Sequence, residues 1–394
     1  MSDDFLPFAK PCIGEEEINE VVDTLRSGWL TSGPKTKQFE QAFVDYFQVP
    51  YALAVNSCTA GLHLALEAIG IQAGDKIITT PYTFTATAEV MRYLGADPVF
   101  VDIDRHTFNI DVNQLEAVLK AEPNIKAIIP VHFAGQACDM DVILDLAQQY
   151  GLKVIEDAAH ALPSTYKNRK VGTLGDITVY SFYVTKPVAT GEGGMIVTSN
   201  PEYAQRINTM RLHGINRDVF DRSQSSQPSW YYEIVAPGFK YNMSDIMAAI
   251  GIHQFAKMEL FAQQREAIAR QYSHGLIGLP LKTPERQYPC DSQHAWHLYV
   301  LQLDLEKLSI NRNEFIEQLA QHGVGASVHF IPLHLQPYWQ QRYQFQPQDF
   351  PIALDAYQRA VSLPIYPSMN EDDVNKVITV VKTICHHFTV KNNP

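Results

Sequence analysis

Cysteines and long apolar runs are both scarce in this sequence, and each scarcity excludes a class of protein. The chain of 394 residues has five cysteines, at positions 12, 58, 138, 290 and 385, with no CxxC pair. This odd, scattered set indicates reduced thiols and favours neither a disulfide framework nor a zinc site. No apolar run approaches the length of a membrane span, and the first four residues are not typical of a signal peptide. We therefore expect a soluble cytoplasmic protein.

Positive charge is also in short supply. Lys and Arg number 31 against 43 Asp and Glu, so the net charge is −12 at pH 7. An acidic surface argues against general binding to nucleic acid or to an anionic membrane. It does not exclude an anionic small molecule, because a few local donors can bind a phosphate. With 46% apolar residues the chain can fill a core, and we expect an enzyme.

Strand-like and helix-like segments alternate along the first two-thirds of the chain. Several strand-like runs are almost continuously apolar, as is typical of strands buried on both faces. The alternation predicts right-handed crossovers and a mainly parallel seven-stranded α/β sheet sandwiched by helices. The expected strands are residues 51–56, 76–79, 98–102, 127–132, 153–156, 177–182 and 194–198. The expected helices are residues 60–69, 85–94, 113–119 and 140–150. Only a loop separates the last two strands, which suggests one antiparallel edge.

The pattern changes near residue 250. A long helical pattern runs from residue 243 through 266 and beyond, and it is followed by an expected strand at 296–303, a helix at 312–322 and a strand at 325–329. We interpret this part as a smaller α+β domain. The predicted organisation is a large domain over residues 1–250 and a small domain over residues 251–394.

Ligands of doubly wound sheets gather at the carboxyl ends of the strands, so the residues after each strand are candidates. Residues 57–61 (Ser-Cys-Thr-Ala-Gly) open a helix whose free N–H groups could hold a phosphate; an ordinary N-cap is the alternative. Residues 81–85 include Phe84, whose ring could stack on a flat cofactor or simply pack in the core.

Two charged residues follow later strands. Asp157 ends a buried strand, where a carboxylate is costly unless it is paired; it could hold a protonated ring nitrogen or be an N-cap. Lys186 lies between an apolar strand and a glycine cluster at 191–194, which suits an amine with a lowered pKa, although a lone lysine is usually a surface residue. Taken in order, these parts match what pyridoxal phosphate requires: an anion site, a ring face, a carboxylate and an imine-forming lysine.

With these residues in place, the chain resembles the DegT/StrS family of nucleotide-sugar aminotransferases, which have fold type I of the pyridoxal-phosphate enzymes, the aspartate-aminotransferase-like fold. The resemblance covers nearly the whole chain. It rests on motifs at residues 28–34, 56–60, 130–135, 156–160, 181–186, 191–194, 213–214 and 240–242.

The resemblance implies a role for each of these site residues. Lys186 would form the imine with pyridoxal phosphate and later shuttle a proton. Asp157 would pair with the pyridinium nitrogen, Phe84 would stack on the ring, and His160 would lie beside the cofactor.

It also implies how the phosphate is bound. Thr59, Ala60 and Ser181 would hold it, and Asn242 would reach it from the neighbouring subunit of a homodimer with shared active sites. The chain departs from the pattern at Pro187, where many relatives have Asn, and at Cys58 inside the predicted cradle.

The implied substrates are a nucleotide-linked keto sugar and L-glutamate, used in two half-reactions. UDP- or dTDP-4-keto sugars are favoured, with most similarity to the branch that makes 4-amino-4-deoxyarabinose on UDP. Trp29, Thr31 and His329 resemble residues on the sugar-nucleotide side, although His329 could also be a strand-end histidine capped by backbone. Arg217 is a candidate for binding diphosphate or carboxylate.

Two other functions remain open. One is a pyridoxal-phosphate sugar dehydratase or lyase; family members of that type carry His where this chain has Lys186. The other is a non-catalytic regulatory protein, in which Lys186 or Asp157 would have been lost. The sequence does not fix the sugar, the nucleotide, or C3 against C4 amination.

Overall fold

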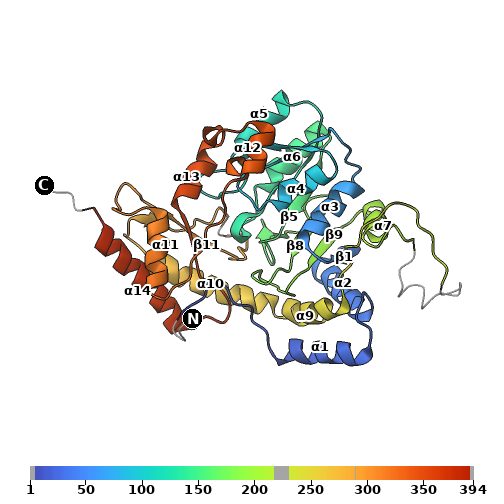
Figure 1. Ribbon diagram of the computed structural model, residues 1–394, viewed down its shortest axis with the longest axis horizontal. Coiled ribbons are helices and arrows are strands. Elements are labelled where there is room, and N and C mark those ends of the chain that lie inside the picture. The colour runs from blue at the N-terminus through green and yellow to red at the C-terminus, as the bar shows by residue number, and fades with distance from the viewer. Residues whose placement is uncertain (1–4, 217–229, 289, 391–394) are drawn as a thin grey trace.

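The computed structural model describes residues 5–216, 230–288 and 290–390 (Figure 1). Its central element is a seven-stranded sheet in the order β1-β9-β8-β5-β4-β2-β3. The strands are β1 (Tyr51–Val55), β2 (Lys76–Thr79), β3 (Asp97–Phe100), β4 (Ile125–Ile128), β5 (Lys153–Asp157), β8 (Ile177–Ser181) and β9 (Gly194–Thr198). All seven expected strands are present, and the α/β class with a mainly parallel sheet is confirmed.

The antiparallel strand is not at an edge of the sheet, so that part of the prediction is wrong. β9 runs antiparallel to both of its neighbours, β1 and β8. The first strand of the chain pairs along the outer side of β9, from Tyr51 opposite Thr198 to Val55 opposite Gly194. β9 is therefore an internal strand with both of its hydrogen-bonding sides occupied.

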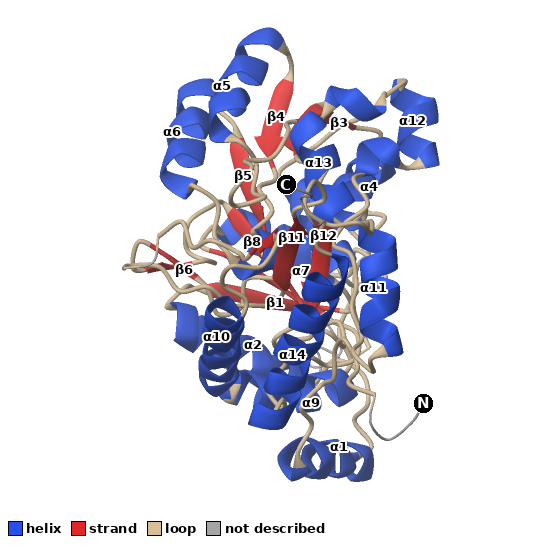
Figure 2. Ribbon diagram, turned by 90° about the vertical axis from the view of Figure 1, so that its left-hand side faces the viewer, coloured by secondary structure: helices blue, strands red, loops and turns tan. Residues whose placement is uncertain are grey.

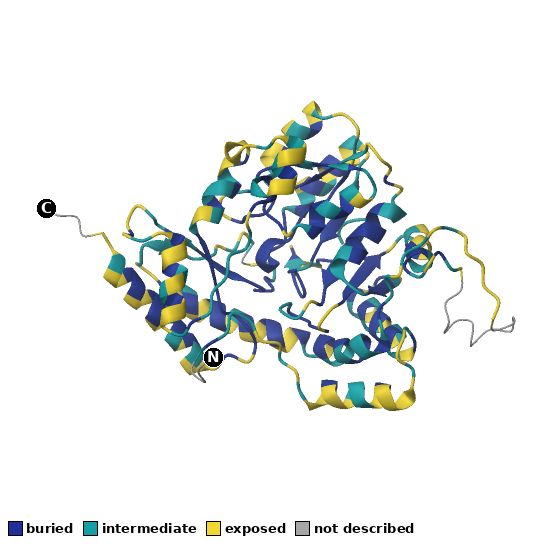
Figure 3. Ribbon diagram, viewed as in Figure 1, coloured by how far each residue is buried: buried dark blue, intermediate teal, exposed yellow. Residues whose placement is uncertain are grey.

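Side-chain alternation along the strands divides the core into two layers. In β1, Ala52 and Ala54 face one cluster, whereas Leu53 and Val55 face the other, as the two-residue period of a strand requires. The first layer contains α2 (Pro34–Phe47), α5 (Val112–Ala121), α6 (Met140–Tyr150) and α9 (Asp245–Ala256). The second contains α3 (Cys58–Ala68), α4 (Ala86–Tyr93) and α7 (Pro201–Met210). Helices thus cover both faces of the sheet (Figure 3).

A second, smaller sheet has the order β10-β11-β12. Its strands are β10 (Leu281–Lys282), β11 (Tyr299–Leu303) and β12 (Ala360–Leu363), and a short hairpin, β6 (Thr165–Tyr166) with β7 (Arg169–Lys170), lies apart from both sheets. The core of this part is formed with α10 (Met258–Gly275), α11 (Arg312–Gln321) and α14 (Glu371–Phe388), while α12 (Pro337–Tyr343) and α13 (Pro351–Arg359) pack nearer the large sheet (Figure 2).

Two expectations for this part are wrong. The long helix is interrupted at Lys257, which caps α9 and α10 and whose ammonium group binds Glu16 and Glu17 of α1 (Glu15–Ser27). Residues 325–329 form no strand: only Ser327 makes a bridge, to Ser362. The backbone at the start of this segment pairs with the N-terminal segment instead. The Leu6 N–H donates to the Gly323 carbonyl, and the Leu6 carbonyl accepts the Gly325 N–H.

The boundary at residue 250 stays a prediction. No helix within the described ranges combines the length and apolar character needed to cross a bilayer.

Candidate active site

Lys186 lies in the loop after β8, where its backbone N–H closes a turn onto the Tyr183 carbonyl at 2.8 Å. Its Nζ is 3.4 Å from Nε2 of His297. Burial lowers the pKa of Lys186 to about 8, against the opposing effects of Cys58 and Asp157. At pH 7 about a tenth of the amine is then neutral, far more than in an ordinary lysine, and the neutral amine is the nucleophile that forms an imine.

Asp157 is the last residue of β5 and only 5% exposed. One carboxylate oxygen accepts a hydrogen bond from Thr87 Oγ1 at 2.7 Å, and the other accepts one from the Ala159 N–H at 3.1 Å. Burial raises the pKa of Asp157. Among the described residues no cation forms an ion pair with it, so a protonated ring nitrogen would supply the missing positive partner.

The start of α3 has the geometry both of an ordinary N-cap and of a phosphate site, the two interpretations that the sequence left open. Ser57 is the N-cap and its hydroxyl accepts the Ala60 N–H at 3.1 Å, so the N-cap interpretation is correct. The other N–H groups of the first turn have no acceptor within a helix, which keeps them available for an anion. Across from them, a Cβ at Gly194 would lie 2.9 Å from the Cys58 nitrogen, so glycine is needed for β9 to approach this turn.

Cys58 and Ser181 complete this end of the site. Ser181 is paired with Gly194 across β8 and β9 and is nearly buried. The charges of Asp157 and Lys186 both act on Cys58, and burial raises the pKa of its thiol far above the ordinary value. Cys58 is therefore a neutral thiol within the site. Thr59, the neighbouring candidate, is partly exposed.

Three histidines surround Lys186. Nδ1 of His160 accepts the Ala134 N–H at 3.2 Å, which places the proton of the neutral ring on Nε2. The ring of His160 lies 4.4 Å from that of His297. Burial lowers the pKa of both rings, and that of His329 to about 3, with the positive charge of Lys186 acting in the same direction. The lysine thus faces neutral imidazoles.

Aromatic rings lead from this cluster to the surface. Phe330 is stacked at 5.9 Å on His160, and the ring of Phe84, which is 60% exposed, lies 6.2 Å from Phe330. His329 bonds the hydroxyl of Ser362 at 2.9 Å and stacks on Phe8 at 5.4 Å. Because its partner is a side chain and its segment is not a strand, the alternative of a strand-end histidine capped by backbone is wrong.

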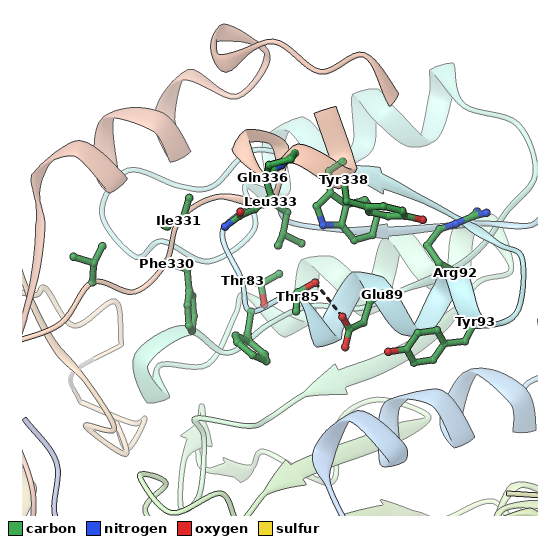
Figure 4. Close-up of a pocket in the computed structure, with 14 residues that line it drawn as sticks. Thr83, Thr85, Glu89, Arg92, Tyr93, Phe330, Ile331, Leu333, Gln336 and Tyr338 are labelled. Atoms are coloured by element: carbon green, nitrogen blue, oxygen red, sulfur yellow. Dashed lines mark hydrogen bonds between the residues drawn. The ribbon is translucent and has the colours of Figure 1, made fainter. Parts of the chain in front are cut away.

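A cavity of about 850 Å³ opens beside Phe84 and Phe330. One wall is formed by α4 and the residues before it, including Glu89 and Tyr93. The other is formed by residues 328–339, including Tyr338 (Figure 4). Phe84 and Phe330 thus belong both to this cavity and to the ring cluster, whereas Lys186 and Asp157 do not line the cavity.

Asn242 belongs to a second group of predicted residues, beside the end of β1. It forms a backbone bridge with Val55, and its side-chain N–H donates to Ser32 Oγ at 2.7 Å. Its Oδ1 is buried with no hydrogen-bond partner among the described residues. The adjacent loop carries Trp29, whose Nε1 donates to the Ser32 carbonyl at 3.1 Å, and the exposed Thr31.

Arg217 lies outside the described residues. Thr87, His297 and Phe330 were not among the predicted site residues, although they contact or neighbour Asp157, Lys186 and Phe84. His297 is separated from Lys186 by 111 residues in the sequence, and this separation hides their contact.

Comparisons with known proteins agree with this geometry. The model of the DegT/DnrJ/EryC1/StrS aminotransferase family matches residues 11–382. An uncharacterized protein of Methanocaldococcus jannaschii is 52% identical over 383 residues, 96% of this chain and 97% of that protein. The spore coat polysaccharide biosynthesis protein SpsC of Bacillus subtilis is 50% identical over 382 residues, 96% and 97% of the two chains.

A solved structure from Streptococcus pneumoniae, described as a sugar aminotransferase in its PMP form, superposes with a TM-score of 0.90 at 33% identity, covering 97% of this chain and 99% of that one. The same protein is also known in a PLP form. The unpaired buried carboxylate, the lysine with a lowered pKa and the open helix start fit that cofactor. The chain therefore belongs to the DegT/DnrJ/EryC1/StrS family of pyridoxal-phosphate-dependent sugar aminotransferases.

Proposed function

We propose that this protein transfers an amino group from L-glutamate to a UDP- or dTDP-linked 4-keto sugar, giving a nucleotide-linked 4-amino sugar. The observation that carries the proposal is the grouping of Lys186, Asp157 and the open start of α3. A cavity of about 850 Å³ is lined by Phe84 and Phe330, and Phe330 stacks on His160 of this group. The named B. subtilis relative belongs to polysaccharide biosynthesis, which consumes activated sugars of this kind.

When bound, pyridoxal phosphate supplies an electron sink for the bond changes at the amino-bearing carbon. We assign the chain's own residues as follows. The α3 start with Thr59 and Ala60, together with Ser181, binds the phosphate. Asp157 holds the proton on the ring nitrogen.

The reacting side belongs to Lys186, whose Nζ attaches the cofactor and then moves a proton at the substrate carbon. His160, whose neutral ring carries its proton on Nε2, would lie beside the cofactor. Phe84 would stack on one face of the ring.

The size of the cavity supports a nucleotide-linked acceptor. About 850 Å³ lies in the upper part of the range for pockets that bury a drug-sized ligand, more than a monosaccharide fills. Its rim offers the faces of Tyr93 and Tyr338, which are 55% and 53% exposed and suit a flat base. The keto sugar would then extend past Phe330, while His329 and the loop with Trp29 and Thr31 flank the site.

Replacing Tyr338 with alanine should raise the KM for the nucleotide sugar about 10-fold, roughly 1.4 kcal/mol, because a stacking partner is lost. The glutamate half-reaction should stay unchanged. Steady-state kinetics with each substrate varied in turn measures the effect. Gln341→Ala is the matched control, since Gln341 is exposed on the same helix but does not line the cavity. Equal effects of Tyr338→Ala on both substrates would contradict this placement.

A homodimer with shared sites forms part of the proposal. Trp230, Ile234 and Val235 are 73%, 67% and 58% exposed, and an exposed apolar group of this kind is typical of a protein interface. The buried, unpartnered Oδ1 of Asn242 supports an interacting group supplied from outside the described chain.

A panel of UDP- and dTDP-linked 3-keto and 4-keto sugars tests the acceptor. With L-glutamate as donor, we expect 2-oxoglutarate release with at least one 4-keto sugar. The position of the new amino group is read by NMR of the product. Loss of a sugar hydroxyl without 2-oxoglutarate release would favour the dehydratase instead, and no turnover of any nucleotide sugar would overturn the proposal.

A further inference from the structure

A small cavity lies beside Lys186 and shares no lining residue with the large one. Its volume is about 20 Å³, and its walls come from the N-terminal segment, the loop after β8, α10 and the residues preceding β11. Lys186, Arg265 and His297 are among the residues that line it. This volume is enough for one water molecule if polar partners are present.

Arg265 is the first polar partner. It lies on α10, is 3% exposed, and donates from Nη1 to the carbonyls of Ile365 at 2.5 Å and Trp296 at 3.3 Å. Its Nε–H is buried and has no acceptor among the described residues. Burial lowers the pKa of Arg265 to about 10, so the group is a cation near neutral pH and can only donate.

His297 is the second. It follows Trp296 directly, is 5% exposed, and places Nε2 3.4 Å from Lys186 Nζ. Its Nδ1 is buried and likewise without a partner in the described part of the chain. The positive charges of Arg265 and Lys186 both lower the pKa of His297, which burial has already lowered. The ring is neutral, so one of its nitrogens donates and the other accepts.

We propose that one water molecule in this cavity accepts a hydrogen bond from Arg265 Nε–H and donates one to His297 Nδ1. The direction is fixed at one end, because the guanidinium cannot accept. With the water donating to Nδ1, His297 carries its proton on Nε2. When Lys186 is in its neutral form, His297 donates this proton to the lone pair of Nζ, which lies 3.4 Å away. Arg265 and His297 are thus positioning residues that stabilise Lys186 as a neutral amine. We call this chain of hydrogen bonds, from Arg265 through the water and His297 to Lys186, the relay. It acts on the lysine and does not depend on which amino donor or sugar the enzyme uses.

The relay predicts the direction in which the pKa of Lys186 is shifted. A donor aimed at Nζ stabilises the neutral amine and lowers the pKa of Lys186, whereas an acceptor would stabilise the ammonium and raise it. The other groups that act on Lys186 are Cys58 and Asp157, which oppose the lowering, and the neutral rings of His160 and His329. These groups are unchanged when His297 is replaced.

The test follows the ionisation of Lys186 in the full-length protein freed of cofactor, by competitive acetylation across pH and mass spectrometry of the Lys186 peptide. We expect a midpoint of about 8 for the wild type and a rise of about one pH unit in His297→Phe, which cuts the neutral fraction about 10-fold at pH 7. His297→Gln, whose amide N–H can replace Nε2–H, should restore the midpoint.

His334→Phe is the control, because His334 is also a buried histidine but lies in the 3-10 turn at Leu333–Leu335 and does not line this cavity; the Lys186 midpoint of this variant should not move. A crystal structure of the wild type gives the second readout: a water within about 2.7–3.2 Å of both Arg265 Nε and His297 Nδ1. A lowered or unchanged midpoint in His297→Phe, or a cavity without that water, overturns the relay. Should His297→Phe fail to fold, the crystal structure and His297→Gln still decide.

Discussion

Replacing Lys186 with alanine is expected to abolish covalent cofactor binding and to reduce kcat by about 10⁴-fold or more. Lys186 is the amine that attaches the cofactor, and its Nζ also moves the proton, so both nucleophilic and general-base contributions are lost together. The first effect is measured by absorbance: borohydride should fix cofactor to the wild type and leave none on the variant. The second is measured by 2-oxoglutarate release.

Lys126→Ala is the matched control, since Lys126 is an exposed lysine on β4 of the same sheet. It should retain the wild-type spectrum and rate. Borohydride-stable cofactor on the Lys186 variant would show that another amine forms the imine and would remove Lys186 from its assigned role.

Replacing Asp157 with asparagine is expected to lower kcat by about 10²–10³-fold, the effect of losing one electrostatic group from a water-excluded site. Asparagine keeps the shape and the bond from the Ala159 N–H, but it cannot hold a proton on the ring nitrogen. Single-turnover kinetics separates this loss of chemistry from any loss of cofactor affinity.

The same variant should lose activity without losing stability. Burial raises the pKa of Asp157 above its value in the unfolded chain. Ionised Asp157 therefore lowers the free energy of unfolding at neutral pH. Removing that charge should leave the melting temperature of the cofactor-free protein unchanged or higher. Asp145→Asn, on the exposed face of α6, is the control. A variant that loses stability but not kcat would show that Asp157 has only a structural role.

The large sheet could be predicted from the sequence because local patterns determine it. A strand such as Tyr51–Val55 is a continuous apolar run between helical segments, and Lys76–Thr79 has a buried Ile-Ile pair at its centre. The position of β9 could not be predicted, since strand order depends on long-range pairing between residues 51–55 and 194–198. The same holds for residues 325–329, where the N-terminal segment takes the hydrogen bonds that a sheet neighbour would have used.

The site residues also divide into those that the sequence pattern predicts and those that only the fold brings together. Asp157 ends β5 and Lys186 lies in the loop after the neighbouring strand β8, so topology brings them together. His297 and Arg265 come from the last third of the chain, and no local pattern indicates that they approach Lys186. Only a folded arrangement brings them together.

The glutamate half-reaction tests the central claim most directly. The purified enzyme loaded with pyridoxal phosphate is mixed with L-glutamate in the absence of any sugar, and the cofactor spectrum and 2-oxoglutarate are followed together. We predict full conversion to the pyridoxamine form with one equivalent of 2-oxoglutarate per Lys186 site. An unchanged spectrum with no 2-oxoglutarate would contradict glutamate-dependent transamination by this protein.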